Sequence, residues 1–371
     1  MMKVGLVGWR GMVGSMLLQR MREEGDFSRI SPTYFSTSAA GRTYRDPLGA
    51  EHRLFDANSV ESLGEMDIII TCQGGDYTKA VYPVLRASGW SGFWIDAASA
   101  KRMDDDSIIV LDPVNREQIE AGIAAGVRNY IGGNCSITLS LIGLTGLFRA
   151  GLVEWMSMMT YQAASGAGAQ HVKELLGQMS AVARCVDNDL ADPGTPVLDV
   201  LAKAHAASRA SDYPIEAFGA PLAGSIIPWI DSDLGNGVSR EEWKGEVETN
   251  KILGLPPGTI RVDGLCVRVA ALQSHSAAIT LKLKENVELD RLESLIRDAH
   301  EWIDFVPNTR QETIQRLSPA AVSGSLKIGV GRLRRLNVEP QMYSVLTTGD
   351  QLLWGAAEPL RRVLNMILNA Q

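Results

Sequence analysis

Cys135 has a setting that points directly to chemistry. It stands in the stretch GGNCS, residues 132–136, and the apolar run ITLSLIGLTGLF follows it. A thiol in the first turn of a helix lies near unpaired backbone N–H groups and the positive end of the helix dipole, which favour the thiolate. The sequence therefore predicts a nucleophilic cysteine. Because the other cysteines (Cys72, Cys185 and Cys266) are scattered without a CxxC pair, we expect small buried hydrophobes there and no metal site.

An arginine and a histidine share the segment LCVRVAALQSHS, residues 265–276. Arg268 alternates with valines in a strand-like pattern, and an arginine in so apolar a segment must meet an anion or solvent. A substrate carboxylate would be its bidentate partner. His275 follows the strand and is flanked by serines, which suits a general acid or base. A structural or solvated histidine is the alternative.

Further polar residues follow predicted strands. Gln162 ends the strand WMSMMTYQ and would orient a substrate, while Ser165 and Gly166 in the next loop would lie against a cofactor. A polar strand end and a flexible turn are the alternative. Arg102 follows the strand GFWIDAAS and would meet an anion, because ligands bind at the carboxyl ends of parallel strands. It can also be a solvated loop cation.

A charged helix is predicted at SREEWKGEVETNK, residues 239–251. Ser239 is its N-cap, and Glu242 completes a capping box. Glu241 and Lys244 then share one face of the helix. Taken alone, these two residues predict a solvated ion pair.

The N-terminus has the pattern of a dinucleotide-binding turn. The strand KVGLVG ends at Gly8, and Gly11 and Gly14 follow before an amphipathic helix. Gly8 and Gly11 would let the backbone approach a pyrophosphate at the helix N-terminus. The spacing is GxxGxxG, so a plain tight turn in an α/β fold remains the alternative.

The second strand helps to choose the cofactor. The segment PTYFSTS ends in Ser36, Thr37 and Ser38 where an NAD enzyme usually has an acidic residue. With Arg10 nearby, these hydroxyls favour the 2′-phosphate of NADP, although turn chemistry also explains them. Gln73, at the end of the strand MDIIITCQ, would meet the same cofactor.

The whole chain narrows the class of protein. Its 371 residues suit two domains, and a net charge of −7 argues against nucleic-acid binding. The longest apolar run is too short to span a bilayer, and the N-terminus does not resemble a signal peptide, so we expect a cytoplasmic protein without a membrane partner. A cysteine beside a nicotinamide suggests an aldehyde oxidation in which a hemithioacetal gives up hydride and leaves a thioester for water or phosphate.

The motifs together resemble the aspartate-β-semialdehyde dehydrogenase family of the Gram-negative bacterial branch. They are GWRGMVGS, TCQGGDYT, WIDAAS, GGNCS, YQAASGAG, SREEWKG, DGLCVRV and GDQLLWGAAEPLRR. The resemblance implies a Rossmann-type α/β domain over residues 1–133, completed by a C-terminal helix over 350–371. Residues 134–349 would form an α+β catalytic and dimerisation domain of the glyceraldehyde-3-phosphate dehydrogenase-like kind, in a homodimer.

The implied reaction is the NADPH-dependent reductive dephosphorylation of L-aspartyl 4-phosphate to L-aspartate 4-semialdehyde and inorganic phosphate. It belongs to the biosynthesis of lysine (through diaminopimelate), threonine, methionine and isoleucine. The resemblance makes Cys135 the nucleophile and His275 the acid/base. Its substrate contacts are Gln162, Glu241 and Arg268, and its phosphate contacts are Arg102 and Lys244. Its cofactor contacts are Gly8, Arg10, Gly11, Met12, Val13, Thr37, Ser38, Gln73, Ser165, Gly166, Pro193 and Gln351.

Pro193 and Gln351 rest on the resemblance alone. The stretch DNDLADPGTP, residues 187–196, reads as a loop near the cofactor. Glyceraldehyde-3-phosphate dehydrogenase and N-acetylglutamyl-phosphate reductase also use a cysteine and a histidine. The segments around Cys135 and His275 in this chain do not look like those of either enzyme. A non-catalytic NADP-binding paralogue would have no reason to keep Cys135, His275 and the phosphate cations together.

Overall fold

The computed structural model describes residues 1–46 and 49–371. In this part of the chain, the N-terminal portion forms a seven-stranded sheet in the order β5-β2-β1-β6-β7-β9-β8. All its neighbouring strands are parallel. The strands are β1 (Met2–Val7), β2 (Ile30–Ser36), β5 (Phe55–Asp56), β6 (Ile68–Thr71), β7 (Phe93–Asp96), β8 (Ser107–Val110) and β9 (Asn129–Gly132). The predicted Rossmann-type sheet is confirmed.

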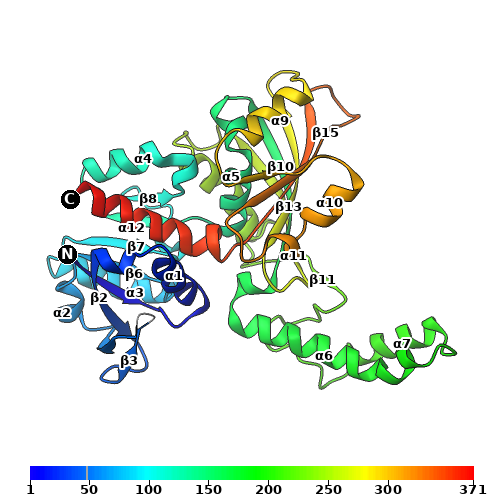
Figure 1. The fold of residues 1–371 in the computed structure, drawn as a ribbon, viewed down its shortest axis with the longest axis horizontal. Helices are drawn as coiled ribbons and strands as arrows, with labels where there is room; N and C mark the ends of the chain where they lie inside the picture. Colours follow the sequence, from blue (N-terminus) through cyan, green and yellow to red (C-terminus); the bar gives the residue numbers. More distant parts are fainter. Residues whose placement is uncertain (47–48) are drawn as a thin grey trace.

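Helices from both ends of the chain cover this sheet. They are α1 (Met12–Glu23), α2 (Val60–Gly64), α3 (Gly75–Ala87), α4 (Asp112–Ala124) and α12 (Glu358–Ala370). Figure 1 shows α12, in red, lying along the sheet beside α4. Leu360 and Val363 of α12 are buried in the same core as Val4 and Leu6 of β1. A separate two-stranded sheet of β3 (Thr43–Arg45) and β4 (Glu51–Arg53) packs beside β2.

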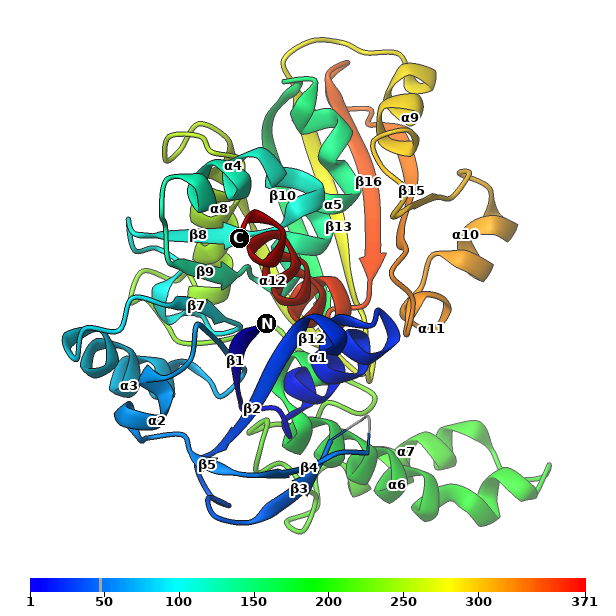
Figure 2. The same ribbon diagram turned by 60° about the vertical axis from the view of Figure 1, so that its left-hand side comes forward.

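The second sheet is mixed and follows the order β11-β12-β10-β13-β16-β15-β14. Its strands are β10 (Val153–Gln162), β11 (Ile226–Ile227), β12 (Arg261–Val269), β13 (His275–Leu283), β14 (Ile303–Phe305), β15 (Ile328–Arg335) and β16 (Met342–Gly349). Helices α5 (Cys135–Arg149) and α9 (Leu289–Arg297) pack on one face (Figure 2). The helix α5 is apolar nearly all round and is buried along most of its length, as expected for a core helix.

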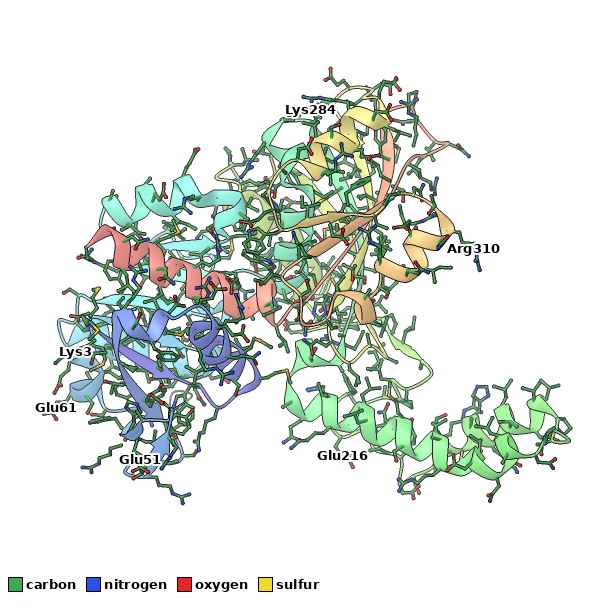
Figure 3. The ribbon with its side chains drawn as sticks, viewed as in Figure 1. Lys3, Glu51, Glu61, Glu216, Lys284 and Arg310 are labelled. Atoms are coloured by element: carbon green, nitrogen blue, oxygen red, sulfur yellow. The ribbon has the colours of Figure 1, made fainter. Side chains whose placement is uncertain are left out.

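The other face of this sheet carries exposed apolar side chains. Met159 and Tyr161 of β10 are 37% and 40% exposed, and Leu265 of β12 is 53% exposed. Short helices α10 (Arg310–Arg316) and α11 (Pro319–Val322) lie near β15 and β16. Charged side chains such as Glu51, Glu61 and Arg310 point outward at the rim of the molecule (Figure 3).

A helical arm projects from the body of the molecule (Figure 1). It consists of α6 (Ala169–Ala191) packed against α7 (Val197–Ala207), and no residue of α7 is buried. The predicted loop over 187–196 is wrong in its first half, because α6 continues to Ala191. With about 1.5 Å per residue, α6 carries the remaining turn about 35 Å from its own first residue.

The segment 265–276 is two strands rather than one. β12 ends at Val269, and β13 begins at His275 after a turn in which Ser274 has φ 71°. β10 lies between them, with Gln162 in register with Arg268. The turn therefore brings Arg268 and His275 to opposite sides of the end of β10. Among the described residues, none of the helices is both long and apolar enough for a membrane span.

Candidate active site

A cleft of about 370 Å³ lies where the carboxyl ends of strands from the two sheets meet α5 and α8 (Arg240–Ile252). It brings together residues that are far apart in the sequence. Those among its lining that the sequence singled out are Val13, Arg102, Cys135, Gln162, Ser165, Gly166, Glu241, Lys244, Arg268 and Gln351. Candidate nucleophile, substrate anchors and phosphate cations therefore share one site.

Cys135 is the first residue of α5, as the sequence predicts. The Asn134 side chain caps the helix, and its Oδ1 accepts from Ser136 N at 3.0 Å and Ile137 N at 3.2 Å. Burial and, to a smaller extent, Glu241 raise the pKa of the Cys135 thiol to about 11, although Arg268, Arg102 and Lys244 act to lower it. The Asn134 cap occupies the N–H groups of Ser136 and Ile137, so these two donors do not face the Cys135 sulfur, and the nucleophilic role of Cys135 stays a prediction.

Gly355 allows the backbone to pack against the nucleophile. A Cβ at this position would lie 2.7 Å from Cβ of Cys135. Gly355 belongs to a π-helical turn, η4 (Leu353–Ala357), just before α12. Such turns occur often at functional sites. Gly355 was not predicted as a site residue from the sequence. The only local indication of a close backbone approach was the run of small residues in WGAA.

His275 is held in one orientation by the backbone. Ala163 N–H donates to its Nδ1 at 3.0 Å, so the neutral ring carries its proton on Nε2. Nε2 is buried and has no hydrogen-bond partner among the described residues. Burial and the neighbouring Arg268 lower the pKa of His275 to about 3, so the ring is neutral near pH 7. At rest it can therefore donate a proton from Nε2 but cannot accept one there.

Arg268 is a buried cation without a carboxylate partner in the described part of the chain. It is 7% exposed, and its Nη1 donates to Ala163 O at 2.8 Å. Gly166 lies against both functional groups, since a Cβ there would be 2.8 Å from His275 Nε2 and 2.9 Å from Arg268 Nη1. A buried guanidinium in this position favours an anionic ligand.

Glu241 and Lys244 are buried, so the solvated-pair interpretation is wrong for them. Lys244 Nζ contacts Glu241 Oε2 at 3.0 Å, while Oε1 of the same carboxylate accepts from Asn134 Nδ2 at 2.8 Å and Gln162 Nε2 at 3.1 Å. Burial acts to raise the pKa of Glu241, but Lys244 and the two amides hold it below its ordinary value. The predicted capping box of Ser239 and Glu242 is confirmed and fixes the start of this helix.

Arg102 and Lys244, which were predicted to contact phosphate, already have carboxylate partners. Lys244 Nζ contacts Asp231 Oδ2 at 2.7 Å, and Arg102 Nη1 contacts Glu248 Oε1 at 3.1 Å. Glu248 Oε2 also accepts from Asn134 N at 2.6 Å. Asp231, Glu248 and Asn134 were not predicted from the sequence. Asp231 and Asn134 line the cleft, and Glu248 meets Arg102 only because distant segments pack together.

The glycine turn between β1 and α1 has the form that a dinucleotide requires. Gly8 has φ +71°, and a Cβ on it would lie 2.5 Å from the backbone of Cys72. Gly11 is the N-cap of α1 and provides no side-chain cap, so the first N–H groups of α1 (beginning at Met12) remain available for a pyrophosphate. This local geometry fits a bound dinucleotide.

Polar side chains gather beyond the ends of β1, β2 and β6. Arg10 Nη2 donates to Ser36 Oγ at 2.8 Å and to Ser38 Oγ at 3.2 Å. Gln73 Nε2 lies 3.5 Å from Thr37 Oγ1. Arg10 makes no ion pair with any described residue. Its guanidinium and the neighbouring hydroxyls could therefore bind an anionic group.

The last two cofactor candidates differ in their placement. Gln351 donates from Nε2 to Ser165 Oγ and accepts from Ser274 N at 2.6 Å, so it joins the cleft. Pro193 lies in the turn that follows α6 and is separated from the cleft by the length of that helix. The structure does not bring Pro193 to the cofactor residues of the same chain.

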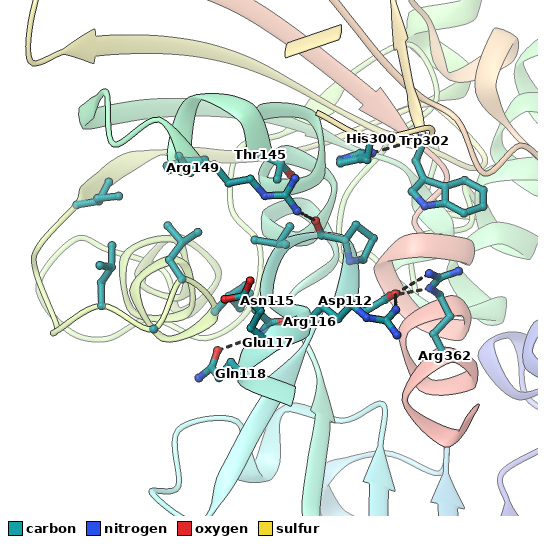
Figure 4. A pocket seen from close by; sticks show the side chains of 18 of the residues that line it. Asp112, Asn115, Arg116, Glu117, Gln118, Thr145, Arg149, His300, Trp302 and Arg362 are labelled. Carbon is teal, nitrogen blue, oxygen red and sulfur yellow. Dashed lines mark hydrogen bonds and ion pairs between the residues drawn. The ribbon is translucent and has the colours of Figure 1, made fainter. Parts of the chain in front are cut away.

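A second cavity, of about 720 Å³, lies at the opposite end of α5 (Figure 4). Arg362 pairs with Asp112 there at 2.5 Å, and His300 Nε2 lies 3.0 Å from the carbonyl of Ile142. No cysteine lines this cavity. The smaller cleft is therefore the candidate active site.

Comparison with known proteins agrees with both halves of the fold. Residues 3–122 match the NAD binding domain of semialdehyde dehydrogenases, and residues 144–354 match their dimerisation domain. The aspartate semialdehyde dehydrogenase from Francisella tularensis is 43% identical, covering 99% of this chain and 100% of its own, with a TM-score of 0.94.

More distant structures share the fold. Aspartate semialdehyde dehydrogenase II from Vibrio cholerae, solved as a complex with ASA, is 23% identical over 99% of this chain and 98% of its own, with a TM-score of 0.80. The enzyme from Candida albicans, solved with NADP, is 17% identical over 100% of this chain and 98% of its own, with a TM-score of 0.67.

Proposed function

The chain belongs to the aspartate-semialdehyde dehydrogenase family, and from this premise we propose that it converts L-aspartyl 4-phosphate and NADPH to L-aspartate 4-semialdehyde, phosphate and NADP through a thioester on Cys135. One observation carries the proposal. The unpaired Arg268 and the unpartnered Nε2 of His275 both face Gly166 in the cleft that contains Cys135.

The charges of the cleft complement those of the substrate. L-aspartyl 4-phosphate carries a carboxylate, an ammonium group and a phosphate. Arg268 would bind the carboxylate, Glu241 the ammonium group, and Gln162 would orient the acyl carbon near the thiol. Arg102 and Lys244 would bind the phosphate. A sugar phosphate has no carboxylate for Arg268, which disfavours a glyceraldehyde-3-phosphate dehydrogenase.

The thiol exchange balances without an external oxidant. Cys135 Sγ attacks the acyl carbon, the bond from that carbon to the phosphate oxygen breaks, and phosphate leaves with the bonding electrons and takes up the proton of the thiol. Arg102 and Lys244 would stabilise the negative charge on the leaving phosphate. The product of this half-reaction is an aspartyl thioester on Cys135.

The reduction of the thioester needs a proton donor as well as a hydride. When bound, NADPH would supply a hydride to the acyl carbon, which would leave negative charge on the former thioester oxygen. His275 Nε2–H would hydrogen-bond that oxygen, since the neutral ring presents a donor there. The backbone N–H of Cys135, which bonds to no described residue, would offer a second donor. The carbon–oxygen double bond would then re-form as the carbon–sulfur bond breaks, which would release the aldehyde and the Cys135 thiolate.

NADP is the cofactor that the polar groups around the glycine turn favour. Arg10, Ser38 and Thr37 would hold the 2′-phosphate, because no acidic side chain ends β2 to bind a free ribose hydroxyl. Gly8, Gly11, Met12 and Val13 would meet the pyrophosphate, and Ser165, Gly166, Gln73 and Gln351 would meet the nicotinamide half.

We also propose a homodimer formed through the uncovered face of the second sheet. Met159, Tyr161 and Leu265 would be covered there by a second copy. Apolar residues on the arm, such as Leu198 at 73% exposure, would be covered in the same way. Pro193 then remains a cofactor candidate only if the arm of one protomer reaches the cleft of its partner.

The proposed product would feed the biosynthesis of lysine through diaminopimelate, threonine, methionine and isoleucine. The four cysteines are unpaired, which suits the reducing cytoplasm.

The proposal is tested in the aldehyde-oxidising direction. NADPH formation is followed by absorbance with L-aspartate 4-semialdehyde, NADP and phosphate, beside a Cys135→Ala control. We expect phosphate-dependent turnover that the variant lacks. Turnover with a different aldehyde only would overturn the substrate, and NADP binding without any turnover would favour the non-catalytic paralogue.

A further inference from the structure

Lys244 lies between two carboxylates. Its Nζ contacts Glu241 Oε2 at 3.0 Å and Asp231 Oδ2 at 2.7 Å, and the lysine is only 8% exposed. Its charge is thus more than balanced within the chain. A phosphate that approaches Lys244 meets two negative groups as well as one positive group, and one carboxylate must withdraw before the phosphate can bind closely.

Glu241 is not the carboxylate that can withdraw. It is 8% exposed, and its other oxygen accepts hydrogen bonds from Asn134 and Gln162. Its movement would leave Asn134 Nδ2 without its acceptor and Gln162 Nε2 with only Thr160 Oγ1, at 3.3 Å. Glu241 also stands in the capped first turn of α8, which fixes its backbone.

Glu248 is equally fixed on the other phosphate cation. Its side chain is 2% exposed, and it binds both Arg102 Nη1 and the backbone N–H of Asn134. Removing it from Arg102 would leave a buried cation and a buried carboxylate unpaired. The Arg102–Glu248 pair therefore stays in place when an anion binds.

Asp231 differs from both glutamates in exposure and in backbone conformation. Its side chain is 34% exposed, and it lies in the turn that precedes α8. Its φ of 70° falls in the left-handed region, which a residue with a side chain rarely adopts. Water can solvate this carboxylate when it leaves Lys244, and a change of backbone conformation would relieve strain.

Other contacts keep Asp231 near the cleft without holding its Oδ2. Ser232 N donates to Oδ1 at 2.7 Å, and Trp229 Nε1 donates to the Asp231 carbonyl at 3.1 Å. Arg240 N donates to Ser232 O at 2.8 Å, which ties the turn to the start of α8. The carboxylate can therefore leave Lys244 while its turn stays attached.

We propose that Asp231 is an exchangeable anion that occupies the phosphate position on Lys244, so that phosphate binds by displacing it and leaves as it returns. This inference rests on the proposed function, because it assigns Lys244 to phosphate. Asp231 then lowers the affinity of the site for phosphate and assists its release. A residue that merely positions Lys244 would have the opposite effect on phosphate affinity.

The test is the variant Asp231→Asn, because asparagine tolerates positive φ and nearly preserves the shape of the side chain. Binding of inorganic phosphate to the full-length protein is measured by calorimetry, and the KM for phosphate is measured in the aldehyde-oxidising direction. We expect both constants to fall about tenfold, because one competing charge is lost. The matched control is Asp233→Asn in the same turn, which should leave both constants unchanged.

An unchanged or higher dissociation constant in Asp231→Asn, with normal phosphate binding by the unmodified protein, would overturn the exchange and make Asp231 a positioning residue. Failure of the unmodified protein to bind phosphate, with NADP binding retained, would instead remove the phosphate assignment and the proposed reaction with it. Thermal unfolding checks that the variants fold. If Asp231→Asn does not fold, Asp231→Gly replaces it, because glycine accepts positive φ without strain.

Discussion

His275 and Arg268 are bound to the same residue of the neighbouring strand end. Ala163 donates its N–H to His275 Nδ1 at 3.0 Å and accepts from Arg268 Nη1 at 2.8 Å through its carbonyl. The predicted acid/base and the predicted carboxylate anchor are therefore positioned by one residue, Ala163, directly after β10. A substrate held by Arg268 would have a fixed distance to His275 Nε2, which is what a near-attack geometry requires.

Replacement of Arg268 by lysine tests the carboxylate anchor. Lysine keeps the charge but loses the planar fork and the bond to Ala163. We expect KM for L-aspartate 4-semialdehyde to rise about tenfold and kcat/KM to fall about a hundredfold. Steady-state kinetics measure both. The control is Arg261→Lys on the exposed part of the same strand, and equal effects of the two variants would remove Arg268 from the site.

Arg10 is expected to determine the preference for NADP. Arg10→Ala removes the cation beside Ser36 and Ser38, so KM for NADP should rise at least about tenfold while KM for NAD stays the same. The measurement is a pair of saturation curves for the two cofactors. Arg128→Ala, at the other edge of the sheet, serves as control. An equal rise in KM for NAD and for NADP would show that Arg10 does not bind the 2′-phosphate.

The titration of Cys135 should differ from that of an ordinary thiol. Burial raises its pKa to about 11, so the thiolate fraction at neutral pH is lower than that of a free cysteine with a pKa near about 8.5. The rate of alkylation by iodoacetamide, with no substrate added, should keep rising with pH beyond about pH 9. A plateau near pH 7 would contradict this picture.

Glu241 contributes to the same shift. Its negative charge raises the pKa of Cys135, so Glu241→Gln should move the alkylation profile to lower pH. Glu246→Gln, on the same helix but outside the cleft lining, should leave the profile in place.

Gly355 should tolerate no side chain. Alanine there would place a methyl group 2.7 Å from Cβ of Cys135 and displace the thiol. A small displacement of a reacting group lowers kcat by about a hundredfold, and we expect that loss with unchanged NADP affinity. Gly64→Ala is the control, because a Cβ at Gly64 meets nothing within 4 Å. Normal kcat in Gly355→Ala would show that the cysteine is not fixed by this contact.

The parts of the site that depend on local sequence were predictable. Gly8 requires positive φ, the Ser239–Glu242 pair caps its own helix, and Cys135 begins α5. Each of these features follows from a few neighbouring residues. Local rules also suggested an activated thiol, but they could not show the burial that raises the pKa of Cys135.

Contacts between distant segments could not be predicted in the same way. The run 265–276 predicts one strand with His275 after it, but it does not show that His275 begins a second strand or that β10 lies between the two strands. Glu248 resembles any surface carboxylate on a charged helix until the end of β9 buries it against Arg102. The length of α6 likewise places Pro193 far from its own cleft.

A thioester on Cys135 is the central claim, and rapid mixing tests it most directly. The enzyme is mixed with L-aspartate 4-semialdehyde and NADP without phosphate, NADPH absorbance is followed, and the mass of the intact protein is then measured. The account predicts a burst of about one NADPH per active site, an aspartyl adduct on Cys135 and steady turnover only after phosphate is added. Steady NADPH formation without phosphate, or activity that persists in Cys135→Ala, would contradict it.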